Sequence, residues 1–269
     1  MSSLKENTLK GKIARKEPVF GMFVSIPHPI VIEMIGHAAF DFVIIDYEHA
    51  TTSMETIENM IRSAELLNIT PLVRISTIER TEILKILDCG AQGIVIPNVT
   101  SKEQVEEVIY HSYYYPIGMR SLNSGRPGIF GKHSLKEYIL KANKELMVIP
   151  MIESLTGVNG SESILSIPQV SFVLEGAADL SQSLSVPWET ENVKVQVHLE
   201  KLYTIARSCN VPYAMVSRNN QAHKKWAQKD VNIFVLGDER GTAFRAFQDK
   251  LEYYKSITGG LNIKYDGAD

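Results

Sequence analysis

The chain has 269 residues, of which 44% are hydrophobic and 22% are charged, and its formal net charge is −3 with an isoelectric point near 6.2. This length and apolar content are enough to bury a substantial core. The weakly acidic balance argues against a general nucleic-acid or anionic-membrane partner, because both surfaces are negatively charged. We therefore expect a small-molecule partner, with no nucleic acid and no membrane.

Targeting signals and a disulfide framework are not expected either. No apolar run reaches the roughly 20 residues that span a bilayer, and the first seven residues lack the apolar core of a secretory signal. Cys89 and Cys209 are far apart and form no Cys-x-x-Cys pair. These features predict a cytoplasmic protein.

Short apolar runs alternate with longer amphipathic segments along the chain, which is typical of repeated βα units around a parallel sheet. In segments such as 53–67 the apolar residues recur every three or four positions, which predicts a helix, and Ser53 is placed to cap it. Eight strands are expected, at 18–24, 41–45, 70–74, 93–96, 146–151, 170–174, 211–216 and 231–236. Eight βα units in roughly 250 residues fit a (β/α)8 TIM barrel, whereas a doubly wound open sheet rarely needs eight evenly spaced parallel strands.

The domain organisation is predicted to be simple. No Pro-, Gly- or Ser-rich linker divides the chain, so residues 1–269 are expected to form one barrel domain, with an N-terminal helix in 1–16 and a tail in 256–269. The amphipathic pattern at 240–255 predicts a last helix. Its apolar side could pack on its own barrel or on a partner subunit.

Polar side chains stand at the ends of several predicted strands. In a barrel of this kind the carboxyl ends of all strands meet at one face, where active sites lie. We therefore expect the following residues to be neighbours in space: Asp46, Glu48, His49, Arg74, Glu153 and Asp179.

Two of these acids are candidate metal ligands. Glu153 and Asp179 follow consecutive strands, and their carboxylates suit a hard divalent cation, Mg²⁺ or Mn²⁺, with water and substrate oxygens as further ligands. A 2-oxo acid bound to such a cation becomes more electrophilic at its carbonyl and forms an enolate more readily.

The other residues supply positive charge and proton transfer. Arg74 would stabilise an oxyanion that develops on the substrate. An imidazole can accept and donate protons under physiological conditions, so His49 would act as general acid or base, with Asp46 or Glu48 orienting it from a supporting position.

Each residue taken alone also has a structural explanation. A strand-end acid is more often a helix cap or a solvated charge, and Arg74 could simply pair with a neighbouring acid. The long connection after residue 113 carries Arg120 and Arg126, and loop arginines are usually solvated. Gly118 and Gly125 nevertheless permit a backbone shaped around a ligand, so both arginines are predicted to bind substrate.

Six segments carry a family resemblance: Asp46-Tyr47-Glu48-His49, Val73-Arg74, Gly90-Ala91-Gln92-Gly93-Ile94-Val95-Ile96-Pro97, Tyr115-Pro116 with Gly118 and Arg120, Met151-Ile152-Glu153-Ser154, and Gly176-Ala177-Ala178-Asp179-Leu180-Ser181. In this order they resemble the HpcH/HpaI family of metal-dependent class II aldolases over roughly residues 18–245. The resemblance implies a (β/α)8 barrel that usually assembles as a hexamer of dimers, with the last helix exchanged between partners. We therefore expect a homo-oligomer, from a dimer to a hexamer.

The resemblance also implies roles for individual residues. It makes His49 the catalytic acid or base and Arg74 the group that polarises the keto oxygen. It makes Glu153 and Asp179 the metal ligands, and it implies that the backbone near Ala178 binds the substrate carboxylate.

Two departures from the usual aldolase pattern bear on the reaction. Ala177 stands where typical members have proline, and the loop at 120–128 looks more like the branch that contains the citrate synthase of siderophore (staphyloferrin B) biosynthesis. We therefore favour citrate synthesis from oxaloacetate and acetyl-CoA. The alternative is a class II aldolase that reversibly cleaves 4-hydroxy-2-oxo acids to pyruvate and an aldehyde. A noncatalytic sensor of a 2-oxo acid or citrate is disfavoured, because base, arginine and both acids are all present.

Overall fold

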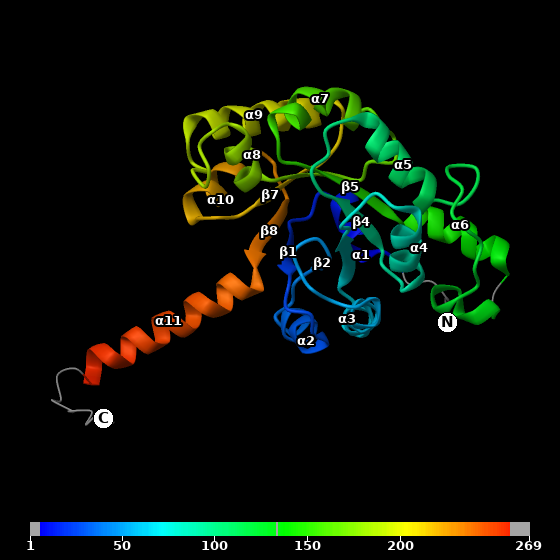
Figure 1. Ribbon diagram of the computed structural model, residues 1–269, viewed down its shortest axis with the longest axis horizontal. Coiled ribbons are helices and arrows are strands. Elements are labelled where there is room, and N and C mark those ends of the chain that lie inside the picture. Colours follow the sequence, from blue (N-terminus) through cyan, green and yellow to red (C-terminus); the bar gives the residue numbers. More distant parts are fainter. Residues whose placement is uncertain (1–5, 133, 259–269) are drawn as a thin grey trace.

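Eight parallel strands close into a barrel in the order of the sequence, with helices around it (Figure 1). The computed structural model describes residues 6–132 and 134–258. The strands are β1 (Val19–Val24), β2 (Phe42–Asp46), β3 (Thr70–Arg74), β4 (Gly93–Ile96), β5 (Met147–Ile152), β6 (Val173–Glu175), β7 (Tyr213–Val216) and β8 (Ile233–Asp238). Every predicted strand overlaps an observed one, so the predicted (β/α)8 barrel is confirmed.

The helices follow the expected alternation, with additional helices between β4 and β5 and between β6 and β7. They are α1 (Thr8–Ala14), α2 (Pro29–His37), α3 (Met54–Leu66), α4 (Arg80–Asp88), α5 (Lys102–Ser112), α6 (Leu135–Glu145), α7 (Leu155–Leu165), α8 (Ala177–Ser183), α9 (Val193–Ser208), α10 (Asn220–Ala227) and α11 (Glu239–Thr258), with a short 3-10 helix η1 (Arg126–Gly131). The predicted cap of α3 is observed, because Ser53 accepts a hydrogen bond from the Thr56 N–H at 3.1 Å. Helix α6 lies inside the connection that the sequence left unassigned, and it is a surface helix whose buried residue is Tyr138.

The core has two layers, because side chains alternate across each strand. Along β2, Phe42 and Ile44 point into the barrel, whereas Val43 and Ile45 pack outward against the helices. Gly21 makes room for the inner layer, since a Cβ atom there would lie 2.2 Å from the Phe42 ring. The inner layer therefore fills the barrel with side chains.

The two ends of the chain behave differently. The predicted N-terminal helix is observed as α1, which buries Leu9 in the inner core, and residues 1–5 of its predicted range lie outside the described residues. Helix α11 continues to Thr258, beyond the predicted start of the tail, and the rest of that tail, 259–269, also lies outside the described residues.

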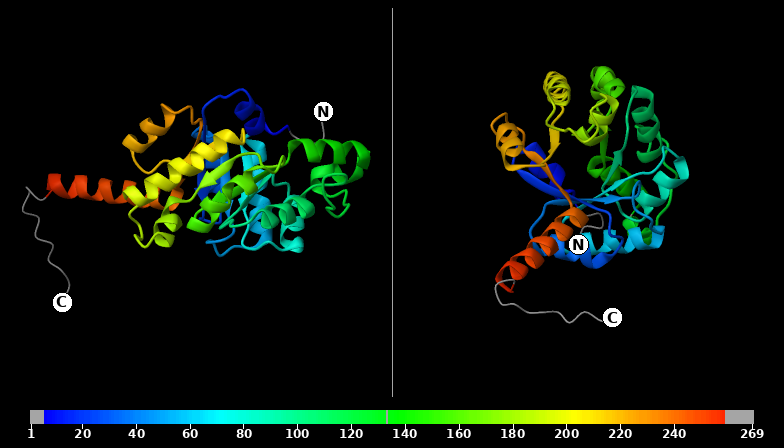
Figure 2. Two further views of the ribbon diagram at one scale, coloured as in Figure 1. Left: turned by 90° about the horizontal axis from the view of Figure 1, so that it is seen from above. Right: turned by 60° about the vertical axis from the view of Figure 1, so that its left-hand side comes forward.

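Helix α11 projects away from the barrel instead of lying on it (Figures 1 and 2). The sequence left two options for this helix, packing on its own barrel or on a partner subunit. The first is not observed, because the helix does not cover its own barrel. Large apolar side chains are exposed along it, namely Phe244, Phe247, Leu251, Tyr253, Tyr254 and Ile257. Among the helices of the described residues, α11 included, none has the length and apolar character required to cross a membrane.

Candidate active site

The carboxyl ends of β2, β3, β5 and β6 bring most of the predicted site residues to one mouth of the barrel. Asp46 and Arg74 end β2 and β3 and are direct register partners. Glu153 follows β5, and Asp179 lies in the first turn of α8, just beyond β6. The neighbourhood predicted from the strand ends is therefore observed.

Arg74 is held by two carboxylates at this mouth. Its Nε donates to Asp46 Oδ1 at 3.1 Å and its Nη2 to Asp46 Oδ2 at 2.8 Å, while Nη1 lies 3.1 Å from Glu48 Oε2. The guanidinium is buried and lies 4.9 Å from the ring centre of Phe23. A guanidinium has five N–H donors, so these contacts leave one on each terminal nitrogen for a substrate oxygen.

Asp46 also fixes the turn that carries the histidine. Its Oδ1 accepts from the backbone N–H groups of Glu48 and His49, at 3.1 and 3.2 Å, and its Oδ2 accepts from the Ser25 hydroxyl at 3.1 Å. Burial pushes the pKa of Asp46 up, but Arg74 and the other donors outweigh burial, so the pKa is lowered overall and the carboxyl is ionised.

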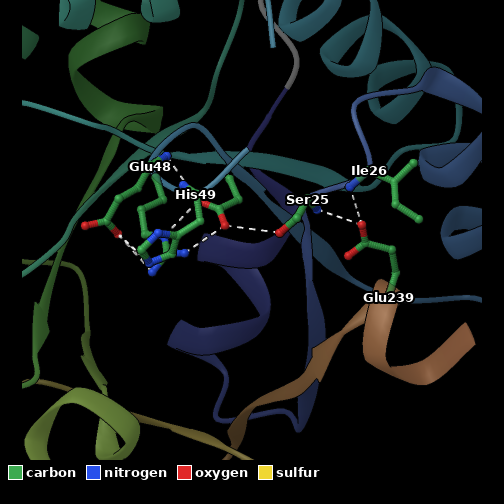
Figure 3. A network of polar contacts seen from close by, with 7 residues as sticks. Ser25, Ile26, Glu48, His49 and Glu239 are labelled. Carbon is green, nitrogen blue, oxygen red and sulfur yellow. Dashed lines mark hydrogen bonds and ion pairs between the residues drawn. The ribbon is translucent and has the colours of Figure 1, made fainter. Parts of the chain in front are cut away.

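His49 is exposed, with 60% of its side chain accessible, and Asp179 is exposed as well. Its Nε2 lies 3.7 Å from Glu48 Oε2, so Glu48 is the side-chain partner of the ring, whereas Asp46 contacts the backbone of the turn (Figure 3). The supporting roles of Asp46 and Glu48 in proton transfer stay predictions. An accessible imidazole beside a fixed arginine can exchange protons with a substrate at the mouth.

Glu153 has one carboxylate oxygen that is not used within the protein. Oε1 accepts from the Asn98 N–H at 2.6 Å, but Oε2 is buried with no hydrogen-bond partner among the described residues. The pKa of Glu153 is raised to about 7, mainly by burial and also by the nearby charges of Asp179 and Glu48, against the lowering effect of the Asn98 hydrogen bond and of Arg74. Gly176 permits this packing, because a Cβ atom there would lie 2.4 Å from the Glu153 Cβ.

The donor set fits a divalent cation with an incomplete protein shell. The described residues contain no cluster of three or more His, Cys, Asp or Glu side chains that could hold a metal. Glu153 offers an unpartnered buried oxygen, and Asp179 is near enough to affect its pKa. Two carboxylates with water and substrate oxygens match the oxygen-rich shells of Mg²⁺ and Mn²⁺.

A second ion pair, between a buried acid and an exposed arginine, lies at the same mouth and was missed from the sequence. Glu175 ends β6 and is 1% exposed, and it binds Arg218 through two contacts of 2.6 and 3.2 Å. It also accepts from the Ala177 N–H at 2.7 Å, next to the half-buried Ala178 that we predicted as substrate-binding. Glu175 stands directly after an apolar run, which is the signal that had identified Glu153, and Arg218 stands two residues after the apolar run that ends at Val216.

The first and last strands contribute two further polar residues that the sequence analysis missed. Ser25 follows β1, and Glu239 follows β8 as the first residue of α11. The Glu239 carboxylate accepts the backbone N–H groups of Ser25 and Ile26 (Figure 3). Strand β1 lies between β2, which carries Asp46, and β8, which leads to Glu239. Ser25 at the end of β1 therefore lies between the two acids.

Arg120 and Arg126 do not join this site within one chain. Arg120 donates to Asp88, the last residue of α4, at 2.8 Å. Arg126 donates to Glu65, near the end of α3, at 2.6 Å, and to the Cys89 carbonyl. Because helices in this fold run back toward the amino ends of the strands, the structure places both arginines at the end opposite the mouth, where the sequence analysis had not expected them.

Comparison with known proteins agrees with these observations. The family model described as HpcH/HpaI aldolase/citrate lyase matches residues 19–246. The chain belongs to this family. The family predicted from the six motifs is therefore confirmed, and the protein is an enzyme of the HpcH/HpaI family with the family's barrel.

Its similarity to individual members includes both aldolases and a synthase. It is 26% identical over 246 residues to the 5-keto-4-deoxy-D-glucarate aldolase of Shigella boydii, covering 91% of this chain and 95% of the relative. The citrate synthase SbnG is 36% identical with a TM-score of 0.87, covering 93% of this chain and 98% of SbnG. An HpcH/HpaI aldolase from Desulfitobacterium hafniense DCB-2 is 27% identical with a TM-score of 0.86, covering 97% and 99% of the two chains.

Proposed function

We propose that this enzyme forms a carbon–carbon bond on a 2-oxo acid held by a divalent metal, and that the reaction is citrate synthesis from oxaloacetate and acetyl-CoA for siderophore biosynthesis. The observation that carries the proposal is the buried Arg74, fixed by Asp46 with two N–H donors left over, near a Glu153 carboxylate that has an unused oxygen. This combination suits a substrate with a keto oxygen next to a carboxylate.

Each residue has a defined task in the proposed reaction. Glu153 and Asp179 would hold Mg²⁺ or Mn²⁺, which supplies Lewis-acid polarisation of the keto group when bound. Arg74 directs its remaining N–H groups at the keto oxygen, where negative charge develops. His49 moves the proton, either by removing it from the methyl group of acetyl-CoA or by delivering it to the new alkoxide.

The overall step is balanced without a redox partner. The methyl carbon of acetyl-CoA loses a proton and bonds to the keto carbon of oxaloacetate, whose oxygen takes up a proton. Water then cleaves the thioester, giving citrate and free CoA thiol. The Ala177–Ala178 backbone at the start of α8 is the proposed contact of the substrate carboxylate.

Similarity favours the synthase over the aldolase. The chain is 36% identical to the citrate synthase SbnG. It is 26% identical to the 5-keto-4-deoxy-D-glucarate aldolase of Shigella boydii and 27% identical to the Desulfitobacterium aldolase. The aldolase remains the second candidate, because Arg74 and the two acids would equally stabilise a pyruvate enolate that attacks an aldehyde.

Thiol release separates the two reactions. The purified full chain with Mg²⁺ or Mn²⁺ should release CoA thiol from acetyl-CoA only when oxaloacetate is added, with citrate identified by mass spectrometry. Pyruvate production from 4-hydroxy-2-oxo acids with no thiol release would instead establish the aldolase. Binding of a 2-oxo acid with neither reaction would point to a sensor.

A matched pair of histidine variants tests the proton-transfer role. His49→Ala should lower kcat by at least about 100-fold, because general acid–base groups contribute about 10²- to 10⁴-fold. His37→Ala is the control, since His37 is exposed at the end of α2, away from the mouth. Equal activity of the two variants would remove His49 from the mechanism.

We also propose that the enzyme works as a homo-oligomer in which α11 packs on a second copy. The exposed apolar side chains of the projecting helix support this arrangement, because such a surface is costly in water. Light scattering coupled to gel filtration should give a multiple of the 30.1 kDa chain mass. Phe247→Glu should reduce that mass, and a monomeric wild-type protein would contradict the proposal.

A further inference from the structure

Glu239 is a buried acid with no task in the reaction as described so far. It is the first residue of α11 and is 7% exposed. Its Oε1 accepts the Ser25 N–H at 2.7 Å and also the Ile26 N–H, whereas its Oε2 is buried without a hydrogen-bond partner among the described residues. Charge-assisted hydrogen bonds of this kind are about twice as strong as neutral ones, so the carboxylate anchors the end of β1.

The anchored segment leads directly to the arginine of the active site. The Ser25 hydroxyl donates to Asp46 Oδ2 at 3.1 Å, and the same oxygen accepts from Arg74 Nη2 at 2.8 Å (Figure 3). All four side chains are buried, with exposed fractions of 7% or less. Hydrogen bonds in such a shielded environment are stronger than in water, so a displacement at one end affects the next partner.

Asp46 connects this contact both to Arg74 and to the turn that carries His49. Its other oxygen accepts from Arg74 Nε and from the backbone N–H groups of Glu48 and His49. Ser25 is the donor that holds Asp46 from the β1 side. A loosened Ser25 would therefore allow Asp46 to shift together with the arginine and with the turn that carries the histidine.

We propose that Glu239 is a positioning residue that sets the placement of Arg74 and His49 through Ser25 and Asp46. Because Glu239 starts α11, the same contact links the direction of the projecting helix to the geometry of the active site. The proposal rests on the proposed role of Arg74 in carbon–carbon bond formation. A purely structural Glu239 would affect folding stability alone, so the two roles predict different kinetics.

The test compares Glu239→Ala with Glu239→Gln and with the control Glu252→Gln, which changes an exposed acid on the same helix. Steady-state kinetics of the full chain are measured well below the melting temperature. Glu239→Ala should lower kcat about 10- to 100-fold with a smaller change in KM, the size expected for a misplacement of the order of 1 Å. Glu239→Gln retains an acceptor oxygen and should stay within about threefold of wild type, like the control.

A double-mutant comparison identifies the path of the effect. Ser25→Ala removes the hydroxyl but keeps the backbone N–H that Glu239 binds, and it should lower kcat several-fold. If Glu239 acts through Ser25, the double variant will be no slower than the slower single variant, because the two changes interrupt one path. Multiplying effects, or a kcat of Glu239→Ala within twofold of wild type, would overturn the proposal.

The test remains decisive even if one variant does not fold or the enzyme shows no turnover. If Glu239→Ala does not fold, a kcat of Ser25→Ala within twofold of wild type is sufficient to reject the path. The affinity for oxalate, a planar enolate analogue, is also measured calorimetrically with Mg²⁺, and it should fall at least fivefold in Glu239→Ala and Ser25→Ala. This binding is independent of which reaction is catalysed, so an inactive wild-type enzyme would count against the proposed function and leave the test of Glu239 intact.

Discussion

The two ends of the barrel hold buried or half-buried arginines in different chemical situations. At the carboxyl end, Arg74 keeps N–H donors for a ligand, and Glu153 keeps a carboxylate oxygen. At the amino end, Arg126 gives both terminal nitrogens to Glu65 and to a backbone carbonyl, and Arg120 pairs with Asp88.

The amino end also has a cavity of about 240 Å³, lined by Arg120, Arg126 and Tyr138 among others. Its arginines nevertheless tie the connection between α5 and α6 to the ends of α3 and α4. Arg120 Nε and Arg126 Nε are also buried without a hydrogen-bond partner among the described residues, so an open donor alone does not mark a reacting site. The comparison teaches that a buried arginine indicates a reacting site when an open carboxylate oxygen and an exposed histidine lie nearby, as Glu153 Oε2 and His49 do at the carboxyl end. The following variants test this distinction.

The largest effect is expected at Arg74. Lysine keeps the charge at this position but cannot form the two-pronged contact with Asp46 and also reach a keto oxygen. Arg74→Lys should therefore lower kcat/KM by about 10²- to 10³-fold, the usual loss when an oxyanion donor is removed. Steady-state kinetics of the variant and the wild type measure the loss in kcat/KM, and circular dichroism checks that both proteins are folded to the same extent. Retention of more than a tenth of the activity would show that Arg74 mainly supports the structure.

Glu153 should produce a smaller effect that depends on pH. Its pKa rises from 4.5 to about 7 on folding, so the folded protein binds the extra proton between these values. The free energy of unfolding of the metal-free protein should consequently fall as pH increases from about 4.5 to 7, by up to about 3 kcal/mol, and level off above. Denaturant unfolding at several pH values across this range measures the change. In Glu153→Gln, this contribution to the pH dependence of the free energy of unfolding should be absent.

Added metal gives the matching control for Glu153. Mg²⁺ or Mn²⁺ should stabilise the wild-type protein most above pH 7, where the carboxylate is ionised, and should stabilise Glu153→Gln much less. Glu137→Gln, at an exposed position on α6, should behave as wild type. Equal stabilisation of all three proteins by the metal would place its binding site elsewhere.

The sequence was sufficient to predict the barrel and the gathering of strand-end residues. Short apolar runs located β2 and β3, and the topology then made Asp46 and Arg74 neighbours. The contact between Ser25 and Glu239 was beyond this reasoning, because it joins residues 214 positions apart and arises only when β8 closes onto β1. Which oxygen of Glu153 remains open likewise depends on the turn at Asn98, a detail of backbone direction.

The placement of Arg120 and Arg126 teaches a different lesson. Both lie between the end of α5 and the start of β5, and a connection from a helix to the next strand lies at the amino end of a barrel. The order of the elements therefore contained the signal that separates them from Arg74. Residue type and neighbouring glycines had suggested a ligand site, but chain direction decides which face a loop reaches.

The smallest effect is expected at Arg126, and it tests the comparison from the amino end. Arg126→Gln leaves Glu65 partly unpaired at a half-buried position, so the free energy of unfolding should fall by about 1–3 kcal/mol while kcat/KM stays within twofold of wild type. Arg62→Gln is the control, because its contact with Glu58 is exposed and its loss should leave the melting temperature unchanged. A large loss of turnover in Arg126→Gln with unchanged stability would contradict the structural role, and it would require this loop to reach the mouth of a second copy.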